Sequence, residues 1–265
     1  MHLVTSVYTM LDTSMLGFFS TDAQVGFYTA ATKLNRMTVE LLTALTAVLL
    51  PRLSFYKENN EDQKFFNLSE KSISIVILLA IPMVIGLIFL AKPLVILFSG
   101  EEYIEAVPAM NIISPIILAI GLTSITGTQI LPALRKEKIT LLSYGGAALS
   151  NITLNFIFIP KFGAKGAALG TLVAEFSVLI IQAIYLHNYI TKTILKSALQ
   201  SIICCIPMIG IILLLSRFIQ NPIILCITVI ILSVIIYALG LTLCKNQYFK
   251  EMTGIFINKL KRKPE

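Results

Sequence analysis

Eight stretches of mostly apolar residues follow one another along this chain, and their length constrains the fold more than any other feature. Each has about the 20 residues that an α-helix needs to cross the hydrocarbon core of a bilayer. Such long, continuous runs are not typical of barrel strands. The sequence therefore predicts an all-α integral membrane protein with about eight transmembrane helices. The expected spans are 3–19, 24–50, 72–91, 107–131, 139–159, 164–187, 197–216 and 222–243.

The composition supports a membrane protein over a soluble one. Hydrophobic residues make up 56% of the chain and charged residues only 13%, against about 25% charged in soluble domains. A soluble protein of 265 residues could not hide so much apolar surface from water, so we expect lipid to be its solvent. The net charge of +7 could suggest nucleic acid, but most basic residues lie in short loops between apolar runs. We expect membrane lipids, and no nucleic acid, as partners.

The sequence contains no pattern of soluble enzyme chemistry. It has no Gly-x-Ser-x-Gly nucleophile turn, no phosphate-binding glycine loop ending in Lys-Ser/Thr, and no His-x-x-x-His pair. The four cysteines, Cys204, Cys205, Cys226 and Cys244, lie in or at the end of apolar stretches without metal-ligand spacing. We predict a protein that is not an enzyme, holds no metal and needs no cofactor.

The lysines and arginines predict the orientation of the chain. When the connections are numbered alternately, 15 of the 21 basic residues fall on one side, four on the other, and Lys33 and Arg36 lie within a span. By the positive-inside rule the richer side is cytoplasmic. With eight spans, both termini are then cytoplasmic, and we expect a multi-pass protein of the bacterial inner membrane.

Two cytoplasmic segments have a character of their own. Residues 53–71 form a polar loop of mixed charge, which we expect to contain some helix. The tail 245–265 places Phe249, Met252, Phe256 and Leu260 at helical spacing opposite lysines. This pattern predicts a basic amphipathic helix lying on the inner leaflet.

The second apolar stretch carries charges on one face. Thr29, Lys33, Arg36, Glu40 and Thr43 recur every three or four residues, which confines them to one side of a helix. Charges inside a bilayer cost about 2.5–3.5 kcal/mol each on insertion scales, so they mark functional candidates. This helix therefore directs a basic stripe at something other than lipid.

Other spans offer polar groups that complement this stripe: Asp12 in the first, Asn151 and Asn155 in the fifth, and Glu175 in the sixth. Two interpretations stay open. In the structural one, Lys33 or Arg36 pairs with an acid and holds the bundle together. In the functional one, the basic face lines a water-filled cavity that receives an anion such as pyrophosphate, because arginine offers bidentate hydrogen bonds and lysine a mobile point charge. The predicted cavity residues are Lys33, Arg36, Asp12, Glu40, Glu175, Asn151 and Asn155.

Three elements of the sequence carry a resemblance to a known family. The first consists of residues 6–17 (SVYTMLDTSMLG) followed by 25–34 (VGFYTAATKL), the second of residues 97–106 (LFSGEEYIEA), and the third of residues 159–171 (IPKFGAKGAALGT). They resemble, in this order, the seventh and eighth helices, the FG-x-x-Y-x-x-A element and the start of the twelfth helix of the polysaccharide flippases, a family that moves O-antigen and capsule repeat units. Lys33 stands where the family's eighth-helix motif has lysine.

The resemblance implies helices seven to fourteen of a carrier with two six-helix lobes. Residues 1–190 would form the C-terminal six-helix lobe, 191–244 two additional transmembrane helices, and 245–265 the cytoplasmic tail. Such a carrier flips an oligosaccharide linked to undecaprenyl pyrophosphate, and basic cavity residues bind the pyrophosphate. The first lobe is missing here, so we expect a truncated reading frame, a split gene or a fragment, with a separate N-terminal lobe as a partner. The alternatives are a multidrug antiporter of the same superfamily and an inactive structural remnant.

Overall fold

The computed structural model describes residues 2–46 and 50–261, and within these ranges the chain forms helices and short connections without a strand. The elements in chain order are α1 (His2–Phe19), α2 (Asp22–Thr46), α3 (Leu50–Glu58), α4 (Asp62–Phe89), α5 (Ala91–Ser99), η1 (Glu101–Ala106), α6 (Val107–Ile113), α7 (Ile116–Ile125), η2 (Thr126–Ile130), α8 (Leu131–Ala133), α9 (Glu137–Phe162), α10 (Ala164–Tyr185), η3 (His187–Tyr189), α11 (Lys192–Phe218), α12 (Pro222–Leu243) and α13 (Gln247–Lys261).

Six helical segments among the described residues are long and apolar enough to cross a membrane. They are α4, the continuous segment Ile116–Ala133, α9, α10, α11 and α12. The prediction of an all-α, multi-pass membrane protein is thus confirmed. The other two expected spans form helices α1 and α2, but these contain more polar residues, and α2 carries Lys33, Arg36 and Glu40 in its central part. The count of about eight spans therefore remains a prediction, and residues 47–49 of the second span lie outside the described residues.

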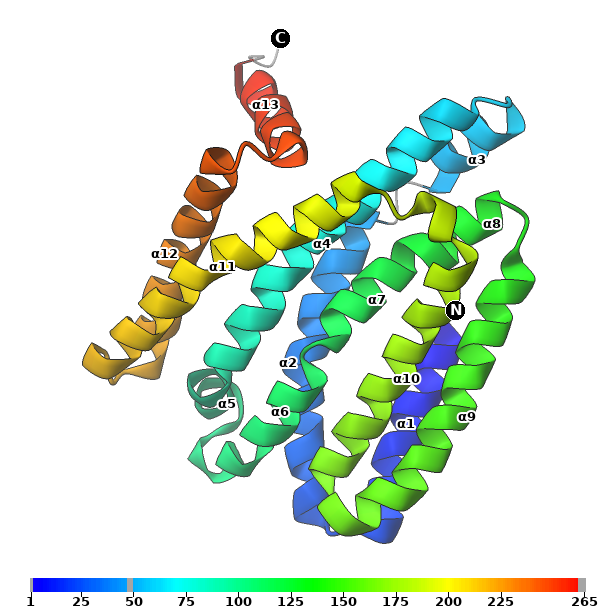
Figure 1. Ribbon diagram of the computed structural model, residues 1–265. Coiled ribbons are helices and arrows are strands. Elements are labelled where there is room, and N and C mark those ends of the chain that lie inside the picture. The colour runs from blue at the N-terminus through cyan, green and yellow to red at the C-terminus, as the bar shows by residue number, and fades with distance from the viewer. Residues whose placement is uncertain (1, 47–49, 262–265) are drawn as a thin grey trace.

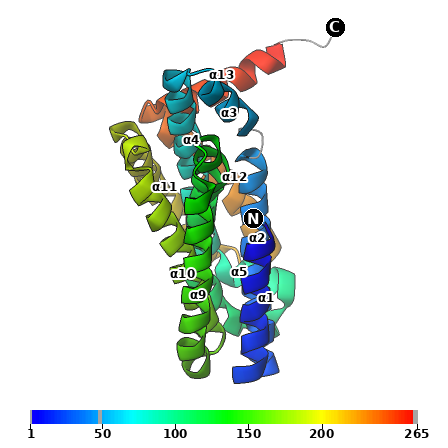
Figure 2. The ribbon, with the colours of Figure 1, turned by 90° about the vertical axis from the view of Figure 1, so that its right-hand side faces the viewer.

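The long helices run side by side, and their connections alternate between two ends (Figures 1 and 2). α3, α8 and α13 lie at one end, which is the end that the sequence predicts to be cytoplasmic. The α1–α2 and α9–α10 turns, α5 and η1 lie at the other. α11 and α12 form a hairpin beside the bundle and pack along α4. Successive long helices thus cross the molecule in opposite directions, as spans must.

Two expected boundaries differ from the structure. The segment 53–71 contains helix, as expected, but the helix of the span expected to begin at residue 72 already begins at Asp62. Ion pairs Lys57–Asp62 (2.6 Å) and Lys64–Glu61 (3.0 Å) lie at that end of α4. The expected span 107–131 is also not one regular helix. It divides at Pro115 into α6 and α7 and continues through the π-helical turn η2. A proline lacks the backbone N–H that would continue the ladder.

Glycines let α9 and α10 approach each other closely. A Cβ atom on Gly166 would lie 2.3 Å from the carbonyl oxygen of Phe158, and one on Gly170 would lie 2.2 Å from Asn155 Oδ1. Both distances are far below a normal contact, so no larger residue fits without separating the helices. The small-xxx-small pattern at 166–170 therefore encodes close helix packing, as such patterns do in membranes.

A hydrogen-bond chain fixes the α11–α12 hairpin to α4. Pro82 has no N–H to bond to the carbonyl of Leu78 one turn earlier. Tyr237 of α12 donates its hydroxyl to this carbonyl at 2.7 Å, and Ser201 of α11 lies 2.6 Å from the same hydroxyl. The proline in α4 is thereby compensated by a neighbouring helix, as hydrocarbon requires.

The α11–α12 contact predicts which cysteines form a disulfide. Cys204 Sγ and Cys244 Sγ are 3.8 Å apart, so side-chain rotation can bring them to bonding distance. We expect mild oxidation with copper phenanthroline to join this pair, detected as a linked peptide by mass spectrometry without reductant. Cys205 and Cys226 serve as internal controls and should remain thiols. A linkage through either of them would contradict the helix register described above.

Candidate functional site

The charged residues of α2 form an exposed ridge, which we call the α2 ridge and define as Thr29, Lys33, Arg36 and Glu40. All four side chains are exposed. Within the described part of the chain, no ion pair joins Lys33 or Arg36 to a carboxylate. The Thr29 hydroxyl donates to the carbonyl of Val25 in its own helix at 2.8 Å. Among the described residues, the ridge therefore presents two cations without an ion-pair partner, with Glu40 one turn beyond Arg36.

The opposite face of α2 determines the direction of the ridge. Tyr28, Ala31, Leu34 and Leu42 are buried against the helices of the bundle, and the helical period then places the ridge on the outer side. Met37 and Leu41 are exposed beside it. If this face met lipid alone, each cation would cost about 2.5–3.5 kcal/mol on insertion scales. The ridge thus requires water or a polar partner.

A buried carboxylate forms a second group. Asp12 of α1 is fully buried and accepts hydrogen bonds from the Tyr28 hydroxyl (2.7 Å), the Thr171 hydroxyl (2.7 Å) and Asn155 Nδ2 (2.6 Å). Asn155 Nδ2 also lies 3.3 Å from Asn151 Oδ1. We call Asp12, Tyr28, Asn151, Asn155 and Thr171 the Asp12 cluster. It joins α1, α2, α9 and α10 through groups that are distant in sequence.

The Asp12 cluster has more acceptors than donors. The hydrogen-bond partners of the carboxylate are neutral, and Asn155 Oδ1 is buried without a hydrogen-bond partner. A buried, uncompensated carboxylate is unfavourable, and so is an orphaned amide oxygen. A bound proton or a small hard cation, which prefers oxygen ligands, would relieve both. No group of three or more His, Cys, Asp or Glu residues in the described ranges is arranged to hold a metal ion, so a cation would be held by the single carboxylate of Asp12 together with neutral oxygens of the cluster.

A third polar group surrounds Gln182, near the C-terminal end of α10. Gln182 of α10 accepts from the Thr126 hydroxyl at 2.6 Å and donates to Ser143 at 3.1 Å. Thr126 begins the π-helical turn η2, and π-turns are frequent at functional sites. Glu175, about two turns before Gln182 in α10, is also buried. The hydrogen bonds of Gln182 connect η2, α9 and α10.

The structure separates the seven residues that the sequence predicts to line one cavity. Lys33, Arg36 and Glu40 are exposed on the α2 ridge. The other four are buried between helices: Asp12, Asn151, Asn155 and Glu175. The pairing of a ridge cation with Asp12 or Glu175 does not occur in the described residues. The roles of all seven residues remain predictions, but the structure places three of them on an exposed face and four of them between packed helices.

Sequence reasoning omitted two members of the Asp12 cluster. Tyr28 and Thr171 both donate to Asp12, yet neither carries a charge, so the search for costly intramembrane charges passed over them. A signal was present, because Tyr28 and Thr171 both lie within the segments that carry the family resemblance.

The comparisons with known proteins agree with that resemblance. Residues 1–108 match the family model described as "Polysaccharide biosynthesis protein". The "Probable low-salt glycan biosynthesis flippase Agl15" of Haloferax volcanii is 25% identical over 69% of this chain and 39% of its own length. A protein of Escherichia coli (strain K12) named for O-antigen transport is 28% identical over 69% of this chain and 44% of its own length. These names describe flippases and transporters, in line with the prediction of a protein that is not an enzyme.

A solved structure shares the fold. The structure titled "Lipid II flippase MurJ, inward closed conformation" matches 98% of this chain and 52% of its own chain, with a TM-score of 0.75 and 21% sequence identity. The chain thus spans about half the length of the proteins that it matches. The matched family model and the relatives thus agree with the sequence segments in their likeness to flippases of polysaccharide biosynthesis, and the solved structure shares the fold.

Proposed function

We propose that this chain forms one lobe of a carrier that moves an oligosaccharide linked to undecaprenyl pyrophosphate across the bacterial inner membrane. The α2 ridge is the observation that carries the proposal. Lys33 and Arg36 lie one turn apart, are exposed, and have no carboxylate partner among the described residues. A pyrophosphate would accept bidentate hydrogen bonds from the arginine and a point-charge contact from the lysine.

The ridge also supports a partner lobe. An exposed basic face beside apolar residues such as Met37 and Leu41 is unsuited to lipid. A second helical lobe facing the ridge would enclose water and substrate between two surfaces, and rocking of the lobes would open that space to either side. In this proposal residues 1–190 form one lobe, 191–244 two accessory helices, and both chain termini are cytoplasmic.

We propose that the Asp12 cluster couples this movement to a gradient. The cluster joins four helices, and its surplus of acceptors favours binding of a proton or a small cation. Gain or loss of that ion changes the hydrogen bond of Tyr28 to Asp12. Tyr28 lies on the inner face of α2, next in sequence to the ridge residue Thr29. The same helix thus responds to the ion on its inner face and to the substrate on its outer face.

Two alternatives make different demands on the ridge. A carrier of organic cations would place acids and aromatic rings at its binding face, whereas here Lys33 and Arg36 would repel a cationic drug. An inactive remnant has no need of intramembrane charges at all. Binding measurements separate these cases, as follows.

We expect Lys33→Gln and Arg36→Gln each to weaken binding of a polyprenyl-pyrophosphate oligosaccharide by about tenfold or more. A charge-assisted hydrogen bond contributes about 1.5–3 kcal/mol, and about 1.4 kcal/mol corresponds to tenfold in affinity. The purified full chain is titrated with the fluorescent lipid-linked sugar, and surface glycan is scored in cells that also supply a complementary lobe.

Lys92→Gln is the matched control, because Lys92 is an exposed lysine of α5 and not part of the α2 ridge. It should bind and transport as the parent chain does. Equal binding by the Lys33 and Arg36 variants would contradict the proposal. Displacement of the lipid-linked sugar by an organic cation such as ethidium would favour the antiporter, and a parent chain without any binding would favour the remnant.

For the Asp12 cluster, we expect Asp12→Asn to fold but to lose dependence of transport on a proton or sodium gradient. The hydroxyls of Tyr28 and Thr171 can rotate to accept from an asparagine amide, so the cluster remains bonded. Asp12→Ala removes the shared acceptor of three buried donors, which keep only longer contacts such as Thr171 to the Ala167 carbonyl (3.1 Å) and Asn155 Nδ2 to Asn151 Oδ1 (3.3 Å). Weakened buried hydrogen bonds are unfavourable, so this variant should lower the melting temperature in detergent. Ser14→Ala, on an exposed position of α1, is the control. Unaltered gradient dependence in Asp12→Asn would contradict the coupling role.

A further inference from the structure

The beginning of α13 is fixed at the end of the bundle that is predicted to be cytoplasmic. Asn246 Oδ1 accepts hydrogen bonds from the backbone N–H groups of Tyr248 (3.1 Å) and Phe249 (3.0 Å), which caps the helix. Asn246 Nδ2 donates to Gln200 Oε1 of α11 at 2.6 Å. α13 then runs across the direction of the long helices (Figure 2). This direction suits a helix that lies along a membrane surface rather than one that enters the bilayer.

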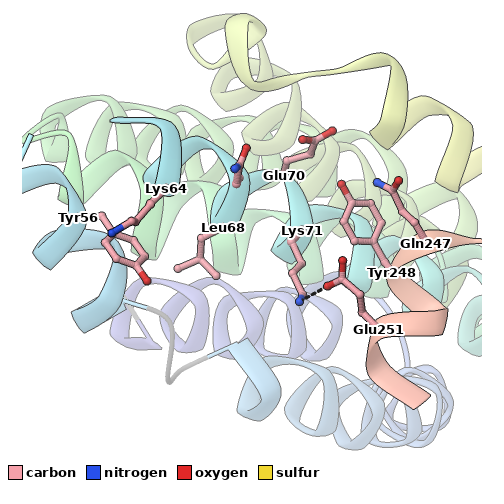
Figure 3. A pocket seen from close by; sticks show the side chains of 9 residues that line it. Tyr56, Lys64, Leu68, Glu70, Lys71, Gln247, Tyr248 and Glu251 are labelled. Carbon is pink, nitrogen blue, oxygen red and sulfur yellow. Dashed lines mark hydrogen bonds and ion pairs between the residues drawn. The ribbon is translucent and has the colours of Figure 1, made fainter. Parts of the chain in front are cut away.

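A second attachment holds α13 against α4. Glu251 forms an ion pair with Lys71 across a polar cavity of about 510 Å³ (Figure 3). Tyr248 is buried beside this cavity, and Phe249 packs against the cluster formed by α4, α11 and α12. The N-terminal part of α4 and that of α11 are therefore both connected to the beginning of α13. The position of α13 is set by the fold and not only by its own sequence.

The sequence of α13 has two different faces. Phe249, Met252, Phe256 and Leu260 follow one another at spacings of three and four, and Lys250 and Lys261 fall on the opposite side. Residues 245–265 contain six cations against two acids, and four of these cations are among the last seven residues, with Arg262 and Lys263 outside the described residues. High amphipathicity with a basic polar face is the composition of helices that lie in a membrane interface.

We infer that α13 binds anionic phospholipids of the cytoplasmic leaflet and anchors the cytoplasmic ends of α4 and α11 to them. The helix follows directly on the apolar helix α12, so it starts at the interface. Its apolar edge can enter the boundary between headgroups and acyl chains, while the terminal cations meet the negative surface potential of the inner leaflet. Charge complementarity thus favours an anionic lipid surface over a neutral one. The inference does not depend on what the lobe transports.

The experiment places a probe on the apolar edge of the full chain. The four native cysteines are changed to serine, Phe256→Cys is labelled with an environment-sensitive fluorophore, and the protein is reconstituted into liposomes with or without phosphatidylglycerol. We expect a blue shift of emission and loss of most iodide quenching only when phosphatidylglycerol is present. High salt should reverse part of both effects, because surface charges are screened.

Charge variants test the recognition itself. Lys259→Gln, Lys261→Gln and Lys263→Gln together should abolish the difference between the two liposome types. Arg135→Gln, Lys136→Gln and Lys138→Gln remove the same charge from an exposed loop at the same end and should leave that difference intact. Equal quenching in both liposomes overturns the inference. A probe that is protected in both, whatever the tail charge, also overturns it, because the apolar edge is then covered by protein.

Discussion

The hydrocarbon core of a bilayer offers no hydrogen-bond partners, so a backbone polar group of this chain that lies within it and faces lipid has to be satisfied by another part of the protein. The constraint is visible wherever a helix is interrupted. Tyr237 bonds to the carbonyl that Pro82 frees in α4, and Gln24 of α2 accepts from the first N–H of α10 at 2.8 Å. In each case the compensating group comes from a different helix. The need to satisfy the backbone groups that a helix interruption leaves free therefore also specifies which helices are neighbours.

The same constraint explains why the polar residues form two separate groups. Asp12 has its partners inside the lobe and is fully buried, whereas Lys33 and Arg36 are exposed and have no carboxylate partner among the residues that the structure describes. α2 carries both groups, because Tyr28 on its inner face reaches Asp12 and the ridge lies on its outer face. Lys33 follows Tyr28 by five residues, about 7.5 Å along the helix at 1.5 Å per residue. A small shift of α2 would therefore act on the buried carboxylate and the basic face together.

The sequence alone predicted the positions of the helices along the chain better than it predicted which side chains are buried and which are exposed. Apolar runs indicated α9, α10 and α12 to within a few residues, because crossing a bilayer fixes both length and composition. It did not indicate α5, whose nine residues are too few to span, or the division at Pro115. Nor did it show that Asp12 is buried while Arg36 is exposed, since the partner Thr171 lies 159 residues away. A charged residue in an apolar run shows that its position is energetically unfavourable in lipid. Whether the side chain is buried or exposed depends on a partner that can be distant in sequence.

The three segments that carry the family resemblance meet at α2, although they are far apart in sequence. The first provides Asp12 and Tyr28 themselves. In the second, Gly100 adopts a positive φ of 99° that ends α5, and Tyr103 then packs edge-on against Phe27 of α2. The third begins α10, where Ala164 is capped by Gln24 of α2 and Thr171 reaches Asp12. These motifs are thus the contacts that hold α2 in register with α1 and α10, and with it the direction in which Lys33 and Arg36 point.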